Sequence, residues 1–335
     1  MRNTTQLRGK RRGFTLIELM IVISLLGIIG TMLTSVLVRQ QRFHRAVTSV
    51  TDARARMRDI STILPTDMRS ISTAGGDILA ITDTSMQVRA FVGASVLCGY
   101  PSAQVIEVPP QVLAPTAPTN SATQRPSVLT AWINPPAPND IVYLYNRGTE
   151  AGNADDAWVP FTITDTASST NSTWCPSTNL PVAFTTAADN SARRYRFTLA
   201  TAPNQTQIEI GAPIRFAREV RYSAYQASDG QWYVGFQRCT PNATYGQPGN
   251  CGTREVLAGP IKPGAADTTT SGFYFVFYNK AGSRMTSLSA TDTIGRVSIG
   301  IRTSSSSLMK ATTRAGGDMT GGDSLRFSIG MRNRI

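Results

Sequence analysis

The chain has 335 residues, 41% of them hydrophobic, and a net charge of +12. Residues 1–13 hold five basic side chains and no acid, and residues 14–64 hold six arginines against three acids, which leaves +4 over the other 271 residues. That excess is ordinary for a globular domain, and no basic run interleaved with aromatic residues accompanies it, so we do not expect nucleic acid as a partner. A single histidine, His44, argues against Ser–His–Asp or Cys–His catalysis, and we expect no enzyme.

The first predicted element is a membrane-spanning helix at residues 14–38. Its only charged side chain is Glu18, and at 1.5 Å per residue it reaches about 37 Å, enough to cross a bilayer with some tilt. The basic residues before it predict a cytoplasmic N-terminus and an exported remainder. A carboxylate in lipid costs about 2.5–3.5 kcal/mol on insertion scales, so Glu18 is a candidate functional residue. Its simplest partner is an α-amino group freed by cleavage between Gly13 and Phe14.

The junction between the basic segment and the helix resembles the class III signal of type IV prepilins and type II secretion pseudopilins. The likeness is carried by Gly13, Phe14 and Glu18, with the basic residues 10–12 and the uninterrupted apolar run. It implies that a prepilin peptidase removes residues 1–13 and methylates the amine of Phe14. It also implies that Glu18 helps to dock the subunit into a helical filament, on an assembly platform in the bacterial inner membrane.

Beyond the span, the helix is predicted to continue as an amphipathic stem over residues 39–64. Apolar residues recur there at three- to seven-residue steps, with arginines on other faces, so one apolar stripe needs a partner surface. Pro65 disfavours helix at the residue before it, and we expect the helix to end at Leu64. The stripe consists of Phe43, Val47, Val50, Met57, Ile60 and Leu64.

Residues 65–335 are predicted to form a β-rich globular head. Within it, residues 101–139 contain nine of the 19 prolines and are expected to be a loop or insertion. Strand signals follow without a βαβ rhythm, which predicts an α+β fold in which a long N-terminal helix packs on an antiparallel β-sheet head, as in pilins. The expected strands are at residues 141–145, 195–199, 220–225, 232–236, 273–278, 297–301 and 325–329.

The order of the C-terminal strands is similar, at the level of pattern, to PilW-like minor pilins and J-type minor pseudopilins. This implies a minor pilin that helps to initiate or cap a type IV pilus, at the tip, with other minor pilins or pseudopilins as partners. A J-type minor pseudopilin of a type II secretion system is the alternative within this class. An adhesive, DNA-binding or substrate-binding module on a pilin stem is the alternative of another class. Many major pilins have a proline towards the end of the apolar run, where this chain has Ser35, which speaks against a major pilin.

All four cysteines lie in the predicted exported part, where disulfides form. Cys239 and Cys251 bracket a turn-rich stretch and are the favoured pair, which leaves Cys98 with Cys175. Four cysteines allow three connectivities, and the sequence alone does not decide between them.

No cofactor is expected, and the cysteine spacing matches no zinc site. Asp318 and Asp323 lie in a Gly-rich stretch and are weak calcium candidates. The EF-hand spacing is absent there, and a hairpin loop is the simpler interpretation.

Overall fold

The chain divides into two compact units, one formed by residues 1–52 and 305–321 and the other by residues 53–304 and 322–335. The computed structural model describes residues 15–72, 76–113, 125–127, 129–132, 134–150, 152, 154–184, 187–244, 246–265, 268–285, 294–303 and 324–331.

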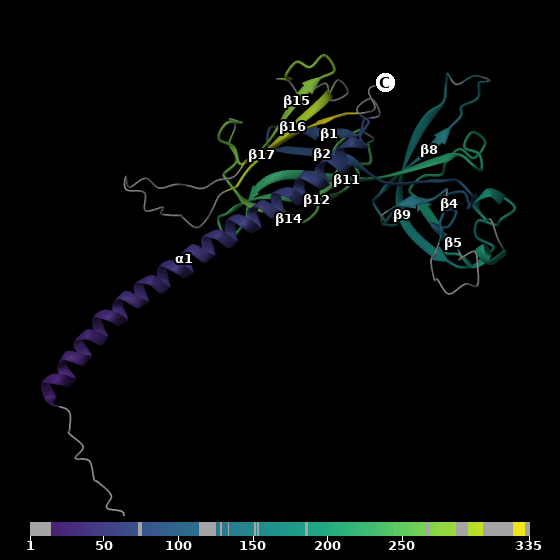
Figure 1. The fold of residues 1–335 in the computed structure, drawn as a ribbon. Coiled ribbons are helices and arrows are strands. Elements are labelled where there is room, and N and C mark those ends of the chain that lie inside the picture. Colours follow the sequence, from purple (N-terminus) through teal and green to yellow (C-terminus); the bar gives the residue numbers. More distant parts are fainter. Residues whose placement is uncertain are drawn as a thin grey trace, which may run out of the picture. The chain divides into compact units, whose positions relative to one another are not determined.

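One long helix, α1 (Leu16–Arg69), covers residues 16–38 of the predicted span and all of the predicted stem, residues 39–64 (Figure 1). In the larger unit, Met57, Ile60, Leu64 and Met68 recur every three or four residues and are buried. They form part of a hydrophobic core with the strands of that unit. The amphipathic stripe is therefore buried from Met57 onward, whereas the side chains of Phe43 and Val47 in the smaller unit are exposed.

The helix does not end at Leu64 but continues through Pro65 to Arg69. A proline inside a helix costs about 3 kcal/mol, because it removes one hydrogen bond and crowds the preceding turn. Here Leu64 and Met68 on either side are fully buried, and each such side chain contributes about 1.5–3 kcal/mol. Burial of this last turn therefore outweighs the local preference of the proline.

The larger unit is built on a twelve-stranded sheet whose main path runs β1-β2-β11-β8-β9-β10-β4-β3. Strand β11 (Pro213–Gln226) pairs along β2 (Ser85–Val96) on one side. On its other side, its first half pairs with β8 (Ile141–Asn146) and its second half with β12 (Trp232–Thr240). All the described pairings are antiparallel, which confirms the predicted α+β fold of a long helix with an antiparallel sheet.

The division of β11 produces two hydrophobic cores in the same sheet. One core joins the end of α1 to β1, β2, the second half of β11, and β12. It also includes the inner face of a separate three-stranded sheet, β15-β16-β17. The other core lies among β4, β8, β9 and β10 and the first half of β11, around Phe197 and Phe216. At the change of core, the β2–β11 register shifts between Phe216 and Ala217, which marks a β-bulge.

Each of the seven strands expected from the sequence is present, with bounds that extend by one to several residues. Residues 101–139, expected as a loop or insertion, contain several short strands, and β4 pairs with β10 inside the main sheet. The remaining elements are β1 (Ile78–Ile81), β3 (Gly99–Ser102), β4 (Val105–Val108), β5 (Val112–Leu113), β6 (Arg125–Pro126), β7 (Ala131–Trp132), β9 (Ala157–Ser169), β10 (Arg194–Leu199), β13 (Asn250–Cys251), β14 (Glu255–Ile261), β15 (Phe273–Asn279), β16 (Ile294–Arg302), β17 (Ser324–Gly330) and the 3-10 helices at Pro181–Ala183 and Ala187–Ser191.

Candidate functional site

The start of α1 brings Thr15 and Glu18 together. The backbone N–H of Glu18 donates to Thr15 Oγ1 at 3.3 Å, so Thr15 caps the helix and Glu18 occupies the third helical position. Thr-x-x-Glu is the sequence of a capping box, and a carboxylate in the first turn is favoured by the helix dipole. This Thr-x-x-Glu pattern is present in the sequence, but the prediction that Glu18 is functional did not depend on it. Thr15 thus caps the helix at Glu18, and any functional test of Glu18 must separate an effect on the start of the helix from a role in assembly.

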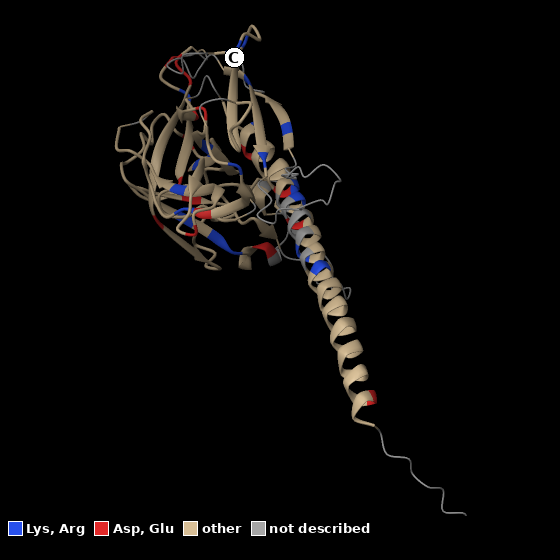
Figure 2. Ribbon diagram, turned by 90° about the vertical axis from the view of Figure 1, so that its left-hand side faces the viewer, with Lys and Arg blue, Asp and Glu red and all other residues tan. Residues whose placement is uncertain are grey.

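The carboxylate of Glu18 is exposed and forms no ion pair or side-chain hydrogen bond with any residue that the structure describes. Figure 2 shows a long stretch without Lys, Arg, Asp or Glu in the first half of the helix. Gly13 and Phe14, the predicted cleavage and methylation site, lie outside the described residues.

The apolar surface of the helix is long enough to cross a membrane. The most apolar 18 consecutive residues within Leu16–Arg45 have a mean hydropathy of 2.4, and none of them is buried. Four hydroxyls in this stretch donate to carbonyls three or four residues earlier, which satisfies them without water. These hydrogen bonds run from Ser24 to Met20, Thr31 to Ile28, Thr34 to Gly30 and Ser35 to Met32. The surface therefore suits lipid or the spans of other subunits.

Residues 8–34 match the family model described as the prokaryotic N-terminal methylation motif. The chain has a prepilin-type N-terminus. The match spans the predicted cleavage site, Glu18 and most of the apolar run, and supports a protein of the pilin or pseudopilin type that a prepilin peptidase processes and that assembles with other pilins. No curated protein and no solved structure matches the chain.

Two disulfides cross-link the larger unit, and they are the two pairs that the sequence favoured. Cys98 is bonded to Cys175 across 77 residues, and Cys239 to Cys251 across 12. The shorter loop is also held at its end, because the N–H of Gly249 donates to the buried Glu219 carboxylate at 2.6 Å. Strand pairing of Cys239 with Cys251 places the two residues directly opposite each other.

We expect the Cys239→Ser/Cys251→Ser variant to lose about 3 kcal/mol of unfolding free energy, because it frees the closed loop in the unfolded chain. Urea unfolding of the purified chain under non-reducing conditions measures this. A loss no larger than that caused by Asn242→Ala, an exposed change inside the same loop, would contradict the prediction.

Asp67, near the end of α1, accepts a hydrogen bond from the hydroxyl of the fully buried Tyr222 on β11. Burial raises the pKa of Asp67 above its ordinary value, and the Tyr222 hydrogen bond and the nearby Arg218 only partly oppose this. Burial likewise raises the pKa of Tyr222 well above its ordinary value. The contact fastens the end of the helix to the sheet through a carboxyl that the fold prefers to be neutral.

The raised pKa of Asp67 gives a pH dependence with a definite sign. Its contribution to stability is fully present below the unfolded pKa, about 3.9, and is lost as pH rises through the higher folded value. Asp67→Asn keeps an oxygen acceptor for Tyr222 and removes the ionisation. We therefore expect the variant to lose less stability than the wild type as pH rises above about 4, measured by urea unfolding across pH. A steeper loss in the variant would contradict this.

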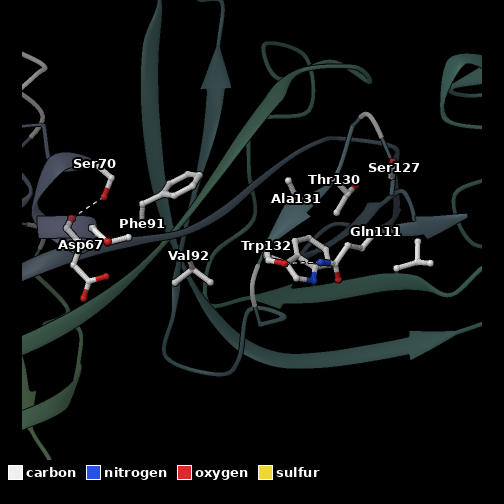
Figure 3. Close-up of a pocket in the computed structure, with 11 residues that line it drawn as sticks. Asp67, Ser70, Phe91, Val92, Gln111, Ser127, Thr130, Ala131 and Trp132 are labelled. Carbon is white, nitrogen blue, oxygen red and sulfur yellow. Dashed lines mark hydrogen bonds between the residues drawn. The ribbon is translucent and has the colours of Figure 1, made fainter. Parts of the chain in front are cut away.

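A hollow of about 620 Å³ lies beside Asp67 (Figure 3). Asp67 and Ser70 stand at one end of it, Phe91 and Val92 in the middle, and Trp132 at the other end. Asp67 is the one charged residue among its described lining residues. This mostly uncharged lining suits an apolar contact.

The other candidate residues are either exposed or outside the described residues. His44 is an exposed residue of α1 beside Phe43, as expected for a solvated helix residue. Asp318 and Asp323 lie outside the described residues. Within the described part of the chain, no three His, Cys, Asp or Glu side chains come together as metal ligands.

Proposed function

We propose that the chain is a minor pilin of the PilW-like kind, which is cleaved between Gly13 and Phe14, methylated on Phe14 and helps to initiate or cap a type IV pilus. The observation that carries the proposal is the methylation motif at residues 8–34, together with the exposed apolar first part of the helix, within Leu16–Arg45. The apolar surface of such a helix contacts lipid before assembly and the spans of neighbouring subunits afterwards. Glu18 is the one charged group of that surface between residues 14 and 38.

The size and cross-linking of the head support a minor rather than a major subunit. A shaft subunit must pack against identical copies along the whole filament, whereas a tip subunit needs only a few neighbours. The described head has two large hydrophobic cores and two disulfides, and Ser35 stands where many major pilins have proline. Its partners are then other minor pilins in the inner membrane, and its action is assembly without catalysis.

Deletion of the encoding sequence tests the assembly role. We expect surface pili to fall in number and to return when the wild-type chain is supplied, but not when the Glu18→Ala chain is supplied. Gold-labelled antibody against the head should mark filament ends. Unchanged piliation with a reduced set of secreted proteins would contradict the pilus assignment and favour a pseudopilin.

A further inference from the structure

The part of α1 that directly follows the apolar run is exposed and basic. Arg39 and Arg45 are both exposed, and neither forms an ion pair with any residue that the structure describes. The chain has no acid between Glu18 and Asp52, which comes about two helical turns after Arg45. The two guanidinium groups therefore lack a counter-charge on the helix around them.

The same part of the helix carries apolar side chains without a protein partner. Phe43 and Val47, about one turn apart, are 61% and 40% exposed, whereas the stripe to which they belong is buried from Met57 onward in the larger unit. Exposed apolar residues beside exposed arginines are the pattern of a helix at the boundary between lipid headgroups and acyl chains.

The spacing of the charges at the two ends of the apolar run matches the thickness of a membrane. Glu18 and Arg39 enclose twenty consecutive uncharged residues, 19–38. At 1.5 Å per residue these cover about 30 Å, which is the thickness of the hydrocarbon core of a typical bilayer. When Arg39 lies at one boundary of the core, Glu18 therefore reaches the other.

Phospholipid phosphates supply the counter-charge that this part of the helix lacks. Guanidinium groups form charge-assisted, often bidentate hydrogen bonds with phosphate oxygens. Arginine stems lie along apolar surface while the charged group stays at the membrane surface. Each basic residue near an anionic membrane strengthens binding about fivefold. A protein partner would have to bring acids to the same level, where lipid phosphates are already present.

We propose that Arg39 and Arg45 bind the phosphates of anionic phospholipids at the membrane surface beyond Val38, with Phe43 at the boundary between headgroups and acyl chains. These contacts fix the depth of the span, so that the carboxylate of Glu18 lies at the opposite boundary and not in the middle of the hydrocarbon. It enters hydrocarbon only when the chain moves towards the surface that holds Arg39. The proposal rests on the membrane-spanning role of α1 in the proposed function and adds a lipid ligand to it.

The test places a fluorophore on the exposed position Gln41→Cys of the full-length chain, whose natural cysteines are disulfide-bonded. The chain is reconstituted in phosphatidylcholine vesicles with a small fraction of either phosphatidylglycerol or phosphatidylcholine that carries a nitroxide near the top of the acyl chain. We expect the nitroxide phosphatidylglycerol to quench about threefold more strongly, because the arginines enrich it around the helix.

Arg39→Gln/Arg45→Gln should remove at least about half of this excess quenching, and Arg39→Lys/Arg45→Lys should keep most of it because the charge remains. The matched control is Arg58→Gln/Arg69→Gln, which removes the same charge from exposed positions of the same helix. Arg58 follows Arg45 by about 20 Å, beyond the screening length of about 10 Å in ordinary salt solution, so the control should leave the preference unchanged.

A second pair of positions tests the depth of the span. With iodide on both sides of the vesicles, a fluorophore on Ile17→Cys, beside Glu18, should be quenched as a group at the membrane surface is. A fluorophore on Ile28→Cys, near the middle of residues 19–38, should be protected, because iodide does not enter hydrocarbon.

Equal quenching by the two nitroxide lipids in the wild type, or an equal loss of preference in both Gln variants, would overturn the proposed lipid site. A preference that inorganic phosphate abolishes, but chloride at equal ionic strength does not, would overturn it in favour of a free anion. Protection of position 17 equal to that of position 28 would overturn the assigned depth. Quenching of both positions by iodide would instead show that α1 does not span the membrane, which would contradict the proposed function as well.

Discussion

Glu18→Ala should insert into the membrane and be cleaved normally, yet be recovered from sheared filaments at least about tenfold less than the wild type. The carboxylate has no partner among the described residues and lies on an apolar surface. We propose that, in a bundle of spans, a cation at the same depth holds it, such as the freed amine of Phe14. Removing one member of a buried ion pair costs about 3–5 kcal/mol. A difference of about 1.4 kcal/mol already changes an equilibrium constant tenfold. Quantitative immunoblots of filament and membrane fractions measure the ratio.

The control for this variant is Thr15→Ala, because Thr15 Oγ1 caps the N–H of Glu18. It removes the cap, at a cost of about 1 kcal/mol, but keeps the carboxylate. If Glu18 acts through assembly, Thr15→Ala should incorporate nearly as well as the wild type and Glu18→Gln nearly as poorly as Glu18→Ala. Equal losses for Thr15→Ala and Glu18→Ala would assign the effect to the start of the helix instead.

Asp140→Ala should destabilise the head by about 3–5 kcal/mol, more than any single exposed substitution. Asp140 is fully buried, and its two oxygens accept from Nε and a terminal nitrogen of Arg218 at 2.7 Å each. A terminal nitrogen of Arg238 lies 3.2 Å from the same carboxylate, and the N–H of Ala137 donates to it at 2.8 Å. The hydrogen bond that Arg218 donates to Asp140 raises the pKa of Arg218. Removing the acid leaves the partly buried Arg218 without its counter-charge.

Urea unfolding of the chain in detergent measures this loss, with Glu209→Ala as the control. Glu209 pairs with Arg147 at 2.9 Å, but both side chains are more than half exposed, at 55% and 64%. Exposed pairs contribute about 0–1 kcal/mol, so the control should change stability little. A loss for Asp140→Ala as small as that for Glu209→Ala would show that the buried cluster is not what holds β8, β11 and β12 together.

Much of the fold could be predicted from local pattern. Strands such as β8 and β15 are rich in aromatic and β-branched residues, and their sequences alone indicated them. The end of α1 could not be predicted, because the burial of Leu64 and Met68 overrides the proline between them. Strand β9 was missed because Pro160 interrupts its pattern, although that residue pairs with Tyr143 in the sheet.

The candidate sites also differ in how far the sequence alone could predict them. The prepilin-type junction was predictable because all its residues are consecutive. The Asp140 cluster was not, since Arg218 and Arg238 follow it by 78 and 98 residues and only the sheet brings them together.

The most direct measurement of the central claim is mass spectrometry of the mature N-terminus, on chain isolated from cells with an active prepilin peptidase. We expect a terminal peptide that begins at N-methylated Phe14, because a small residue, a basic leader and an unbroken apolar run meet at that bond. The same chain from cells without the peptidase should keep residues 1–13. An intact leader in the presence of active peptidase would contradict the account.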